Sequence, residues 1–147
     1  GQEYTLVLDY AHTENGIRTI VESFKNKGKP IFVVTGQAGG REVEKREKIG
    51  SYLLNNVDEV IFTMDDPRYE NVNDIIDQMI GEEKSNNYKR IVDRRKAIKY
   101  ALQKAKQDDI VLVLGKGRDK YMAVENRREP YCDYDVIKEF FGKNTKK

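Results

Sequence analysis

The chain has 147 residues, of which 38% are hydrophobic and 35% charged, and its formal net charge at pH 7 is +2. This length suits one domain with its own core, and so small a net charge, with basic and acidic residues interleaved, argues against nucleic-acid binding. The single cysteine, Cys132, excludes an internal disulfide framework, and no apolar run reaches membrane-spanning length. We therefore expect a cytoplasmic domain with no membrane insertion.

Short β-prone runs alternate along the chain with amphipathic helical patterns. The runs predict strands at 4–8, 31–35, 59–64, 88–92 and 110–114, and the last is the most apolar, which favours a central position. The helical patterns cover 13–26, about 41–54, 75–80, 94–105 and 135–141, and a hairpin is predicted at 121–131. This alternation indicates an α/β domain with a mostly parallel sheet.

Four of the predicted strands run directly into loops rich in glycine or charge. These loops are Asp9–Thr13, Gly36–Arg41, Asp65–Arg68 and Gly115–Asp119. Because the carboxyl ends of parallel strands meet at one edge of a sheet, we expect the four loops to converge there on a binding site. Each loop taken alone has a plainer interpretation. The loop at 65–68 could be a solvated turn whose charges neutralise one another, and His12 a hydrogen-bonded turn residue. Arg41 could belong to a solvated helix face, and Gly115 could simply permit a tight turn.

The loop at 65–68 has the most specific composition. Two carboxylates, Asp65 and Asp66, precede Pro67 and Arg68. Proline restricts the backbone of the turn, so the charges that flank it are held in place. Acids beside a base suit a ligand that carries both an ammonium and a carboxylate group.

Several common catalytic arrangements have no counterpart in the sequence. It contains no G-x-x-x-x-G-K-[ST] phosphate loop, and the turn at Gly36 lacks the G-x-G-x-x-G dinucleotide spacing. One histidine, His12, and one cysteine give no basis for a metal site or a nucleophile triad. The chain therefore offers binding loops and no catalytic residues of its own.

The order of three motifs resembles the C-terminal domain of the Mur ligase family. They are Asp-Tyr-Ala-His-Thr at 9–13, Asp-Asp-Pro-Arg at 65–68 and Gly-Lys-Gly at 115–117. The glycine-rich turn at 36–50 and the segment Asp-Arg-Arg-Lys-Ala-Ile at 93–98 also match. The resemblance extends from about Tyr4 to Phe141 and is greatest to the UDP-N-acetylmuramoyl-tripeptide synthetase branch.

The resemblance implies a Rossmann-like three-layer domain, with the hairpin as a C-terminal antiparallel addition. In the family, ATP phosphorylates the carboxylate of UDP-N-acetylmuramoyl-L-alanyl-D-glutamate, and an amino acid attacks the acyl phosphate to form an amide in peptidoglycan precursor synthesis. The chain at 1–147 corresponds to one domain of that enzyme. A UDP-sugar domain and an ATPase domain, the second of which binds most of the ATP and Mg²⁺, are expected upstream. The isolated domain is therefore expected to be inactive. We also expect it to be a monomer.

The resemblance also assigns roles to matching residues. Residues expected to contact ATP are Asp9, His12 and Lys45. Residues expected to bind the added amino acid are Arg41, Asp65, Asp66, Pro67, Arg68, Gly115 and Asp119.

Three positions differ from the family pattern, and the added amino acid stays open. Asp66 stands where asparagine is usual, Arg118 where histidine is usual, and Asp119 where glutamate is usual. Arg68 favours diaminopimelate, since a guanidinium can bind its distal carboxylate, which lysine lacks. The alternatives are lysine, a paralogue of the cyanophycin- or polyglutamate-forming kind that adds another amino acid, and a non-catalytic binding module.

Overall fold

The computed structural model describes residues 4–145 and confirms the α/β class with a five-stranded parallel sheet. The sheet order is β1-β5-β2-β3-β4, and every neighbouring pair is parallel. The strands are β1 (Thr5–Asp9), β2 (Ile31–Thr35), β3 (Glu59–Phe62), β4 (Tyr88–Arg90) and β5 (Ile110–Leu114). β5 lies inside the sheet between β1 and β2, with all five residues buried, as its continuous apolar run predicts.

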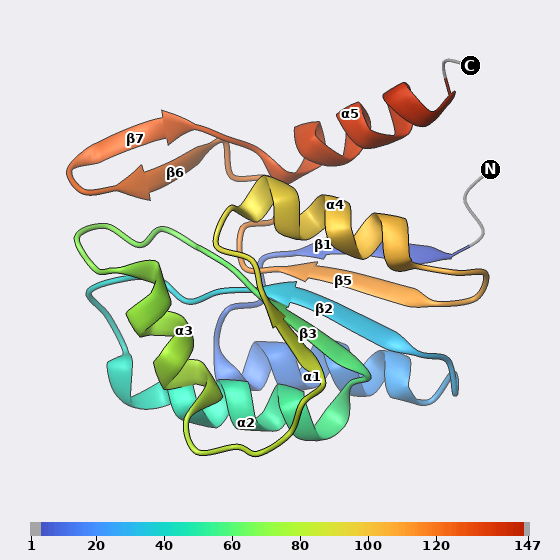
Figure 1. Ribbon diagram of the computed structural model, residues 1–147, viewed down its shortest axis with the longest axis horizontal. Coiled ribbons are helices and arrows are strands. Elements are labelled where there is room, and N and C mark those ends of the chain that lie inside the picture. Colours follow the sequence, from blue (N-terminus) through green and yellow to red (C-terminus); the bar gives the residue numbers. More distant parts are fainter. Residues whose placement is uncertain (1–3, 146–147) are drawn as a thin grey trace.

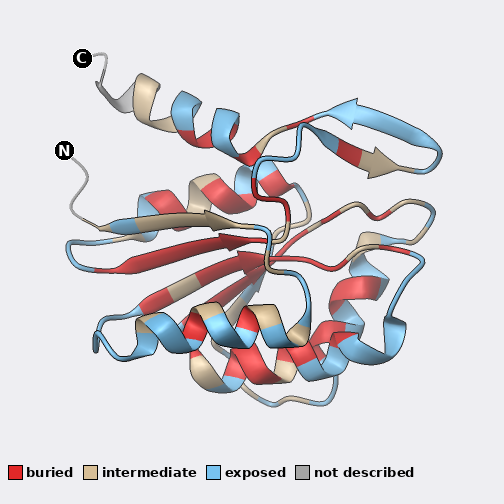
Figure 2. Cartoon of the chain, turned by 180° about the vertical axis from the view of Figure 1, so that it is seen from behind, coloured by how far each residue is buried: buried red, intermediate tan, exposed pale blue. Residues whose placement is uncertain are grey.

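Helices cover both faces of the sheet, which gives the expected three layers (Figure 1). α1 (Glu14–Lys25), α2 (Arg46–Asn56) and α3 (Val72–Ile80) bury their apolar sides against one face. α4 (Arg94–Lys104) and α5 (Asp133–Thr145) pack on the other. In Figure 2 the interior strands are almost entirely buried, whereas the outer faces of the helices are exposed.

Side-chain caps determine where several helices begin. The Thr13 hydroxyl accepts a hydrogen bond from the Gly16 N–H at 3.1 Å, so α1 begins as predicted. Asp93 caps α4 in the same way through the N–H of Lys96. Asn71 caps α3 through the N–H of Asn73, so this helix begins earlier than its apolar pattern indicates.

The prediction for α2 was wrong at its start. Glu42 has a left-handed backbone with φ of 48°, which no residue inside an α-helix adopts. A single 3₁₀ turn, η1 (Val43–Lys45), follows it, and the α-helix begins only at Arg46. Arg41 therefore stays in the loop after β2, where it can face a ligand.

The predicted hairpin is present as β6 (Tyr121–Val124) and β7 (Arg127–Pro130), a separate antiparallel pair. It lies beyond the carboxyl edge of the main sheet, beside the loop that follows β3 (Figure 1). The Arg68 N–H donates to the Ala123 carbonyl at 3.0 Å, and the Glu125 N–H donates to the Arg68 carbonyl at 2.8 Å. The hairpin is thereby attached to the loop that carries the two aspartates.

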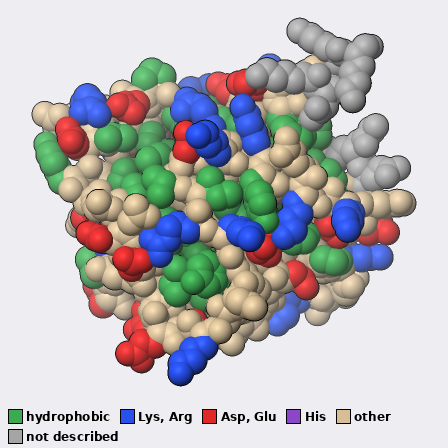
Figure 3. Space-filling model, viewed as in Figure 1, with side chains coloured by type: hydrophobic (Ala, Val, Ile, Leu, Met, Phe, Trp, Pro, Cys, Tyr) green, Lys and Arg blue, Asp and Glu red, His purple; other side chains and the backbone are tan. Residues whose placement is uncertain are grey.

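On the face shown in Figure 3, Lys and Arg side chains are scattered among Asp and Glu side chains rather than gathered in a field of one sign. Within residues 4–145, no helix has the length and apolar character needed to cross a bilayer.

Candidate functional site

The four polar loops converge at the carboxyl edge of the sheet around a cavity of about 450 Å³, as predicted. Most of the residues predicted for a site line it: His12, Arg41, Asp65, Asp66, Arg68, Gly115 and Asp119. A second hollow of about 440 Å³ lies on the hairpin side. It shares Asp66, Arg68 and Asp119 with the first, so these three side chains form the wall between the two cavities.

Three of the predicted residues do not line the main cavity. Asp9 accepts a hydrogen bond from the N–H of Ala11 at 2.8 Å and so shapes its own loop. The Lys45 ammonium lies 3.2 Å from the Glu42 carboxylate on the outer surface. Pro67 contributes its backbone, which packs against the glycine-rich turn.

Asp65 is the most buried of the cavity's charged side chains that lack a hydrogen bond. The residue is only 6% exposed, yet no hydrogen bond to its carboxylate is found within the described part of the chain. Lys116 is its nearest cation, at 3.9 Å. Burial raises the pKa of the Asp65 carboxyl, and the charges of Arg94 and Lys116 oppose that rise. A buried carboxylate in this state gains a great deal from a ligand that donates hydrogen bonds.

Asp66, in contrast, has hydrogen-bond partners. One carboxylate oxygen accepts from the Lys116 ammonium at 2.8 Å and from the Ala123 N–H at 2.8 Å. Burial alone would raise the pKa of Asp66, but these two hydrogen bonds and the charges of Lys116 and Arg68 outweigh it and hold the pKa below its ordinary value. Asp66 is therefore a charged residue whose charge is locally neutralised.

Lys116 holds the acidic side of the cavity together. It is completely buried, with Asp66 at 2.8 Å and both Asp65 and Asp119 at 3.9 Å. Sequence reasoning treated this lysine only as part of a charged loop beside Asp119. The sequence feature that could have indicated its burial is its position between two glycines, just after the most apolar strand.

The two arginines of the cavity keep donors available. One terminal nitrogen of Arg68 donates to the Gly39 carbonyl at 3.0 Å, and the other N–H groups of its guanidinium make no hydrogen bond within residues 4–145. Arg41 is exposed and has no ion pair or hydrogen bond in the described residues. Both guanidinium groups can therefore donate hydrogen bonds to an anionic group of a ligand.

The glycine-rich turn and the loop at 65–70 are in direct backbone contact. The Gly39 N–H donates to the Asp66 carbonyl at 2.9 Å. A Cβ at position 39 would lie 1.8 Å from the Pro67 carbonyl oxygen, so only glycine permits this approach. The loops that carry Arg41 and Arg68 consequently behave as one unit.

Two buried arginines, Arg46 and Arg94, support the loops of the site, and their burial was not predicted from the sequence. Arg94 donates to both carboxylate oxygens of Asp133, to the carbonyl of Met64 just after β3, and to the carbonyl of Leu114 at the end of β5. Arg46 makes a comparable set of bonds from α2. Each arginine shares its helix face with buried residues three and four positions later, a spacing that indicates an inward-facing side chain.

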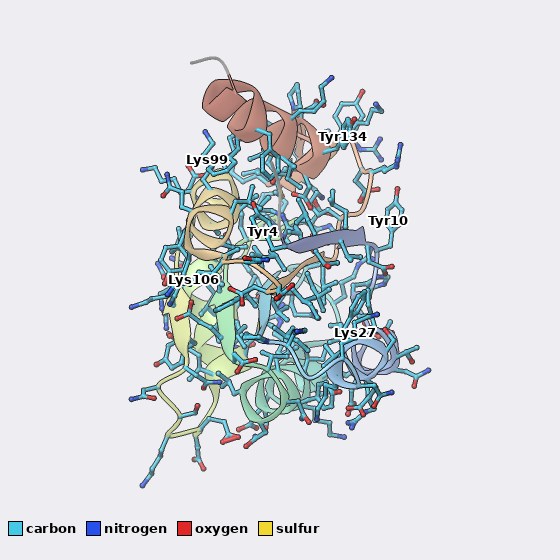
Figure 4. All side chains as sticks on the ribbon, turned by 90° about the vertical axis from the view of Figure 1, so that its right-hand side faces the viewer. Tyr4, Tyr10, Lys27, Lys99, Lys106 and Tyr134 are labelled. Carbon is cyan, nitrogen blue, oxygen red and sulfur yellow. The ribbon has the colours of Figure 1, made fainter. Side chains whose placement is uncertain are left out.

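The loop after β1 projects an aromatic ring beside the cavity. Tyr10 lines the cavity and is half exposed, and its ring lies against Gly117. Figure 4 shows Tyr10 and Tyr134 on one flank of the molecule, while Lys99 and Lys106 project from the opposite flank. The His12 ring nitrogen Nδ1 lies 2.9 Å from the Tyr10 carbonyl, which fixes the ring at the rim.

Comparison with known proteins gives a consistent picture. Residues 1–117 match the family model described as Mur ligase, glutamate ligase domain. The chain is 36% identical over 141 residues to the UDP-N-acetylmuramoyl-L-alanyl-D-glutamate--2,6-diaminopimelate ligase of Oceanobacillus iheyensis, with 94% of this chain and 29% of that protein covered. It is 37% identical over 150 residues to the ligase of the same name from Caldanaerobacter subterraneus, and this match covers 99% of this chain and 31% of that protein.

A solved structure of a ligase with that name superposes with a TM-score of 0.91 and 27% identity over all of this chain and 31% of the other. A folylpolyglutamate synthase/dihydrofolate synthase from Yersinia pestis shares only the fold, with a TM-score of 0.58 and 22% identity. This superposition covers 75% of this chain and 25% of the synthase. The chain spans about 30% of the length of the curated relatives it matches. The chain belongs to the Mur ligase family, in which it corresponds to the glutamate ligase domain.

Proposed function

We propose that this chain is the C-terminal domain of a cytoplasmic ATP-dependent amide ligase. The complete enzyme would add a diamino acid to UDP-N-acetylmuramoyl-L-alanyl-D-glutamate, with meso-diaminopimelate as the first candidate and lysine as the second. One observation carries the proposal: a buried carboxylate without a hydrogen-bond donor, Asp65, and a guanidinium with free donors, Arg68, line the same cavity.

This pair suits the two charges of an amino-acid centre. An ammonium group beside Asp65 would supply the hydrogen bonds that its carboxylate lacks. A carboxylate beside Arg68 would be held by parallel N–H donors, with Arg41 as a second cation at the same cavity. The cost of desolvating Asp65 is already met in the folded protein, so a cationic donor gains most of its interaction energy on binding.

Diaminopimelate is preferred over lysine because Arg68 matches its distal carboxylate. The extra negative charge of Asp66 does not oppose that carboxylate strongly, since the Lys116 ammonium lies 2.8 Å from the Asp66 oxygen. The printed names of the relatives, which specify 2,6-diaminopimelate, support the same choice.

ATP and Mg²⁺ would be bound mainly by a domain outside this chain. Within the described residues, no group of three or more His, Cys, Asp or Glu side chains could hold a metal ion. The contribution of this chain would come from the loop after β1, with the His12 ring at the cavity rim and Asp9 shaping the turn. Lys45 would have to leave Glu42 to reach a phosphate.

The decisive experiment measures phosphate release by the complete ligase that carries this domain. The reaction contains ATP, Mg²⁺ and UDP-N-acetylmuramoyl-L-alanyl-D-glutamate, and the amino acid is varied across diaminopimelate, lysine, ornithine, glutamate and aspartate. We expect the highest kcat/KM with diaminopimelate and no turnover by the isolated chain. Preference for glutamate or aspartate would favour the polyglutamate- or cyanophycin-forming alternative, and failure with every amino acid would contradict the proposal.

A further inference from the structure

Arg46, the first residue of α2, is completely buried and bonded to three different segments. Its terminal nitrogens donate to both Glu70 carboxylate oxygens, at 2.7 and 2.9 Å. They also donate to the Gln78 side chain at 2.7 Å and to the Ala38 carbonyl at 2.9 Å. One side chain thus connects the glycine-rich turn, the loop after β3 and α3.

Glu70 completes the connection from the other side. The oxygen that accepts from Arg46 at 2.7 Å also accepts from the Gly40 N–H at 2.7 Å. The hydrogen bonds from Arg46 and Gly40 hold the pKa of the Glu70 carboxyl at about 2, so this carboxylate is ionised at every physiological pH. We call these two residues and their shared bonds the Arg46–Glu70 clamp.

The Arg46–Glu70 clamp lies close to the cavity but does not line it. Neither Arg46 nor Glu70 lines the cavity, yet Arg41 lies one residue after Gly40, and Arg68 lies two residues before Glu70. The clamp therefore joins, at their bases, the two loops that present the two cavity arginines.

Stability alone is a weak reason for this arrangement. Arg46 loses its hydration completely while the Glu70 side chain stays 32% exposed, and the desolvation of a buried charge offsets much of what its ion pair gains. Here the Nε atom of Arg46 is also buried with no partner in the described residues, which adds to that cost. A directional, multidentate link is better suited to fixing the relative position of two loops.

We propose that Arg46 and Glu70 are positioning residues that set the separation of Arg41 and Arg68 and thereby the affinity for the amino acid. The inference rests on the proposed function, because it assumes that the cavity between these arginines receives the amino acid. Neither residue touches the ligand, and their effect passes through the two loops.

The test uses the complete ligase with Arg46→Lys, Glu70→Gln and the double variant. Arg90→Lys is the matched control, since Arg90 also bonds to α3, through Asp77 and Asn73, without contacting either loop. We expect the KM for the amino acid to rise about 10-fold or more in each single variant, with kcat and the KM for ATP changed less than about threefold. Since both substitutions break one link, the double variant should resemble the worse single variant.

Amide hydrogen exchange gives a readout that needs no turnover. Protection at residues 38–41 and 66–70 should fall in Arg46→Lys and stay unchanged in Arg90→Lys. Unchanged protection, or kcat loss with an unchanged KM for the amino acid, would overturn the positioning role. Absence of turnover by the unsubstituted ligase with every amino acid would overturn the proposed function instead, and the exchange result would still decide whether Arg46 holds the two loops.

Discussion

The ammonium group of Lys116 lies 2.8 Å from the carboxylate of Asp66, and both belong to loops at the carboxyl edge of the sheet. Lys116 is completely buried and also faces Asp65 and Asp119 at 3.9 Å. This buried cation allows three carboxylates to lie close together at a cavity that Arg41 and Arg68 also line.

Lys116→Met should therefore destabilise the chain by about 3 kcal/mol, because it removes the ammonium that donates to Asp66 and lies nearest to the buried carboxylate of Asp65. Denaturant unfolding measures the change. Lys106→Met is the control, since Lys106 is exposed and its ammonium has no partner in the described residues, so its free energy of unfolding should change by less than about 0.5 kcal/mol. Equal effects of the two substitutions would refute the role of Lys116.

Asp66→Asn tests whether the charge of Asp66 is already neutralised. Asparagine keeps an oxygen that can accept from Lys116 and Ala123, so we expect a loss of stability of only about 1 kcal/mol. The ratio of kcat/KM for diaminopimelate to that for lysine should change less than about threefold in the complete ligase. A large gain for diaminopimelate would mean that Asp66 repels the distal carboxylate after all.

Gly39→Ala should separate the two arginine-bearing loops. The added methyl would lie 1.8 Å from the Pro67 carbonyl oxygen, which is backbone and cannot turn aside. We expect a loss of about 2 kcal/mol or more in the free energy of unfolding. Gly142→Ala in α5 is the matched control, because nothing lies within 4 Å of its added methyl, and it should be neutral or slightly stabilising.

The Glu70 carboxyl predicts a specific pH dependence. Its pKa is about 2 in the folded chain, below the 4.5 of the free side chain, so its interactions stabilise the fold fully above pH 4.5. That stabilisation is lost as the pH falls toward 2. We expect Glu70→Gln to cost about 2 kcal/mol at pH 7, an amount reduced by partial solvent exposure, with the difference from the unsubstituted chain vanishing near pH 2. A difference independent of pH would show that the charge is irrelevant.

Periodicity and strand-end chemistry were enough to predict the sheet, the helices and the convergence of four loops. β5 was identified by five consecutive apolar residues, and the loop at 65–68 by its acids, Pro67 and Arg68. These features are local in sequence, so they can be recognised from composition and spacing alone.

The supporting contacts could not be predicted in the same way, because their partners are distant in sequence. Arg46 meets Glu70 across 24 residues, and Arg94 meets Asp133 across 39. In a chain that is 35% charged, nothing distinguishes a buried arginine from an exposed one except its place on the apolar face of a helix. The left-handed backbone of Glu42, which moved the start of α2 to Arg46, likewise has no signature in the residue itself.

Arg68→Ala in the complete ligase tests the central claim most directly, through the KM values for diaminopimelate and for ATP. Because the substitution removes the guanidinium proposed to hold the distal carboxylate, we predict a KM for diaminopimelate raised about 100-fold, a KM for ATP within about twofold, and little change in the KM for lysine. Equal increases for diaminopimelate and lysine would contradict the role of Arg68 at the distal carboxylate, and no increase for either would contradict the assignment of this cavity to the incoming amino acid.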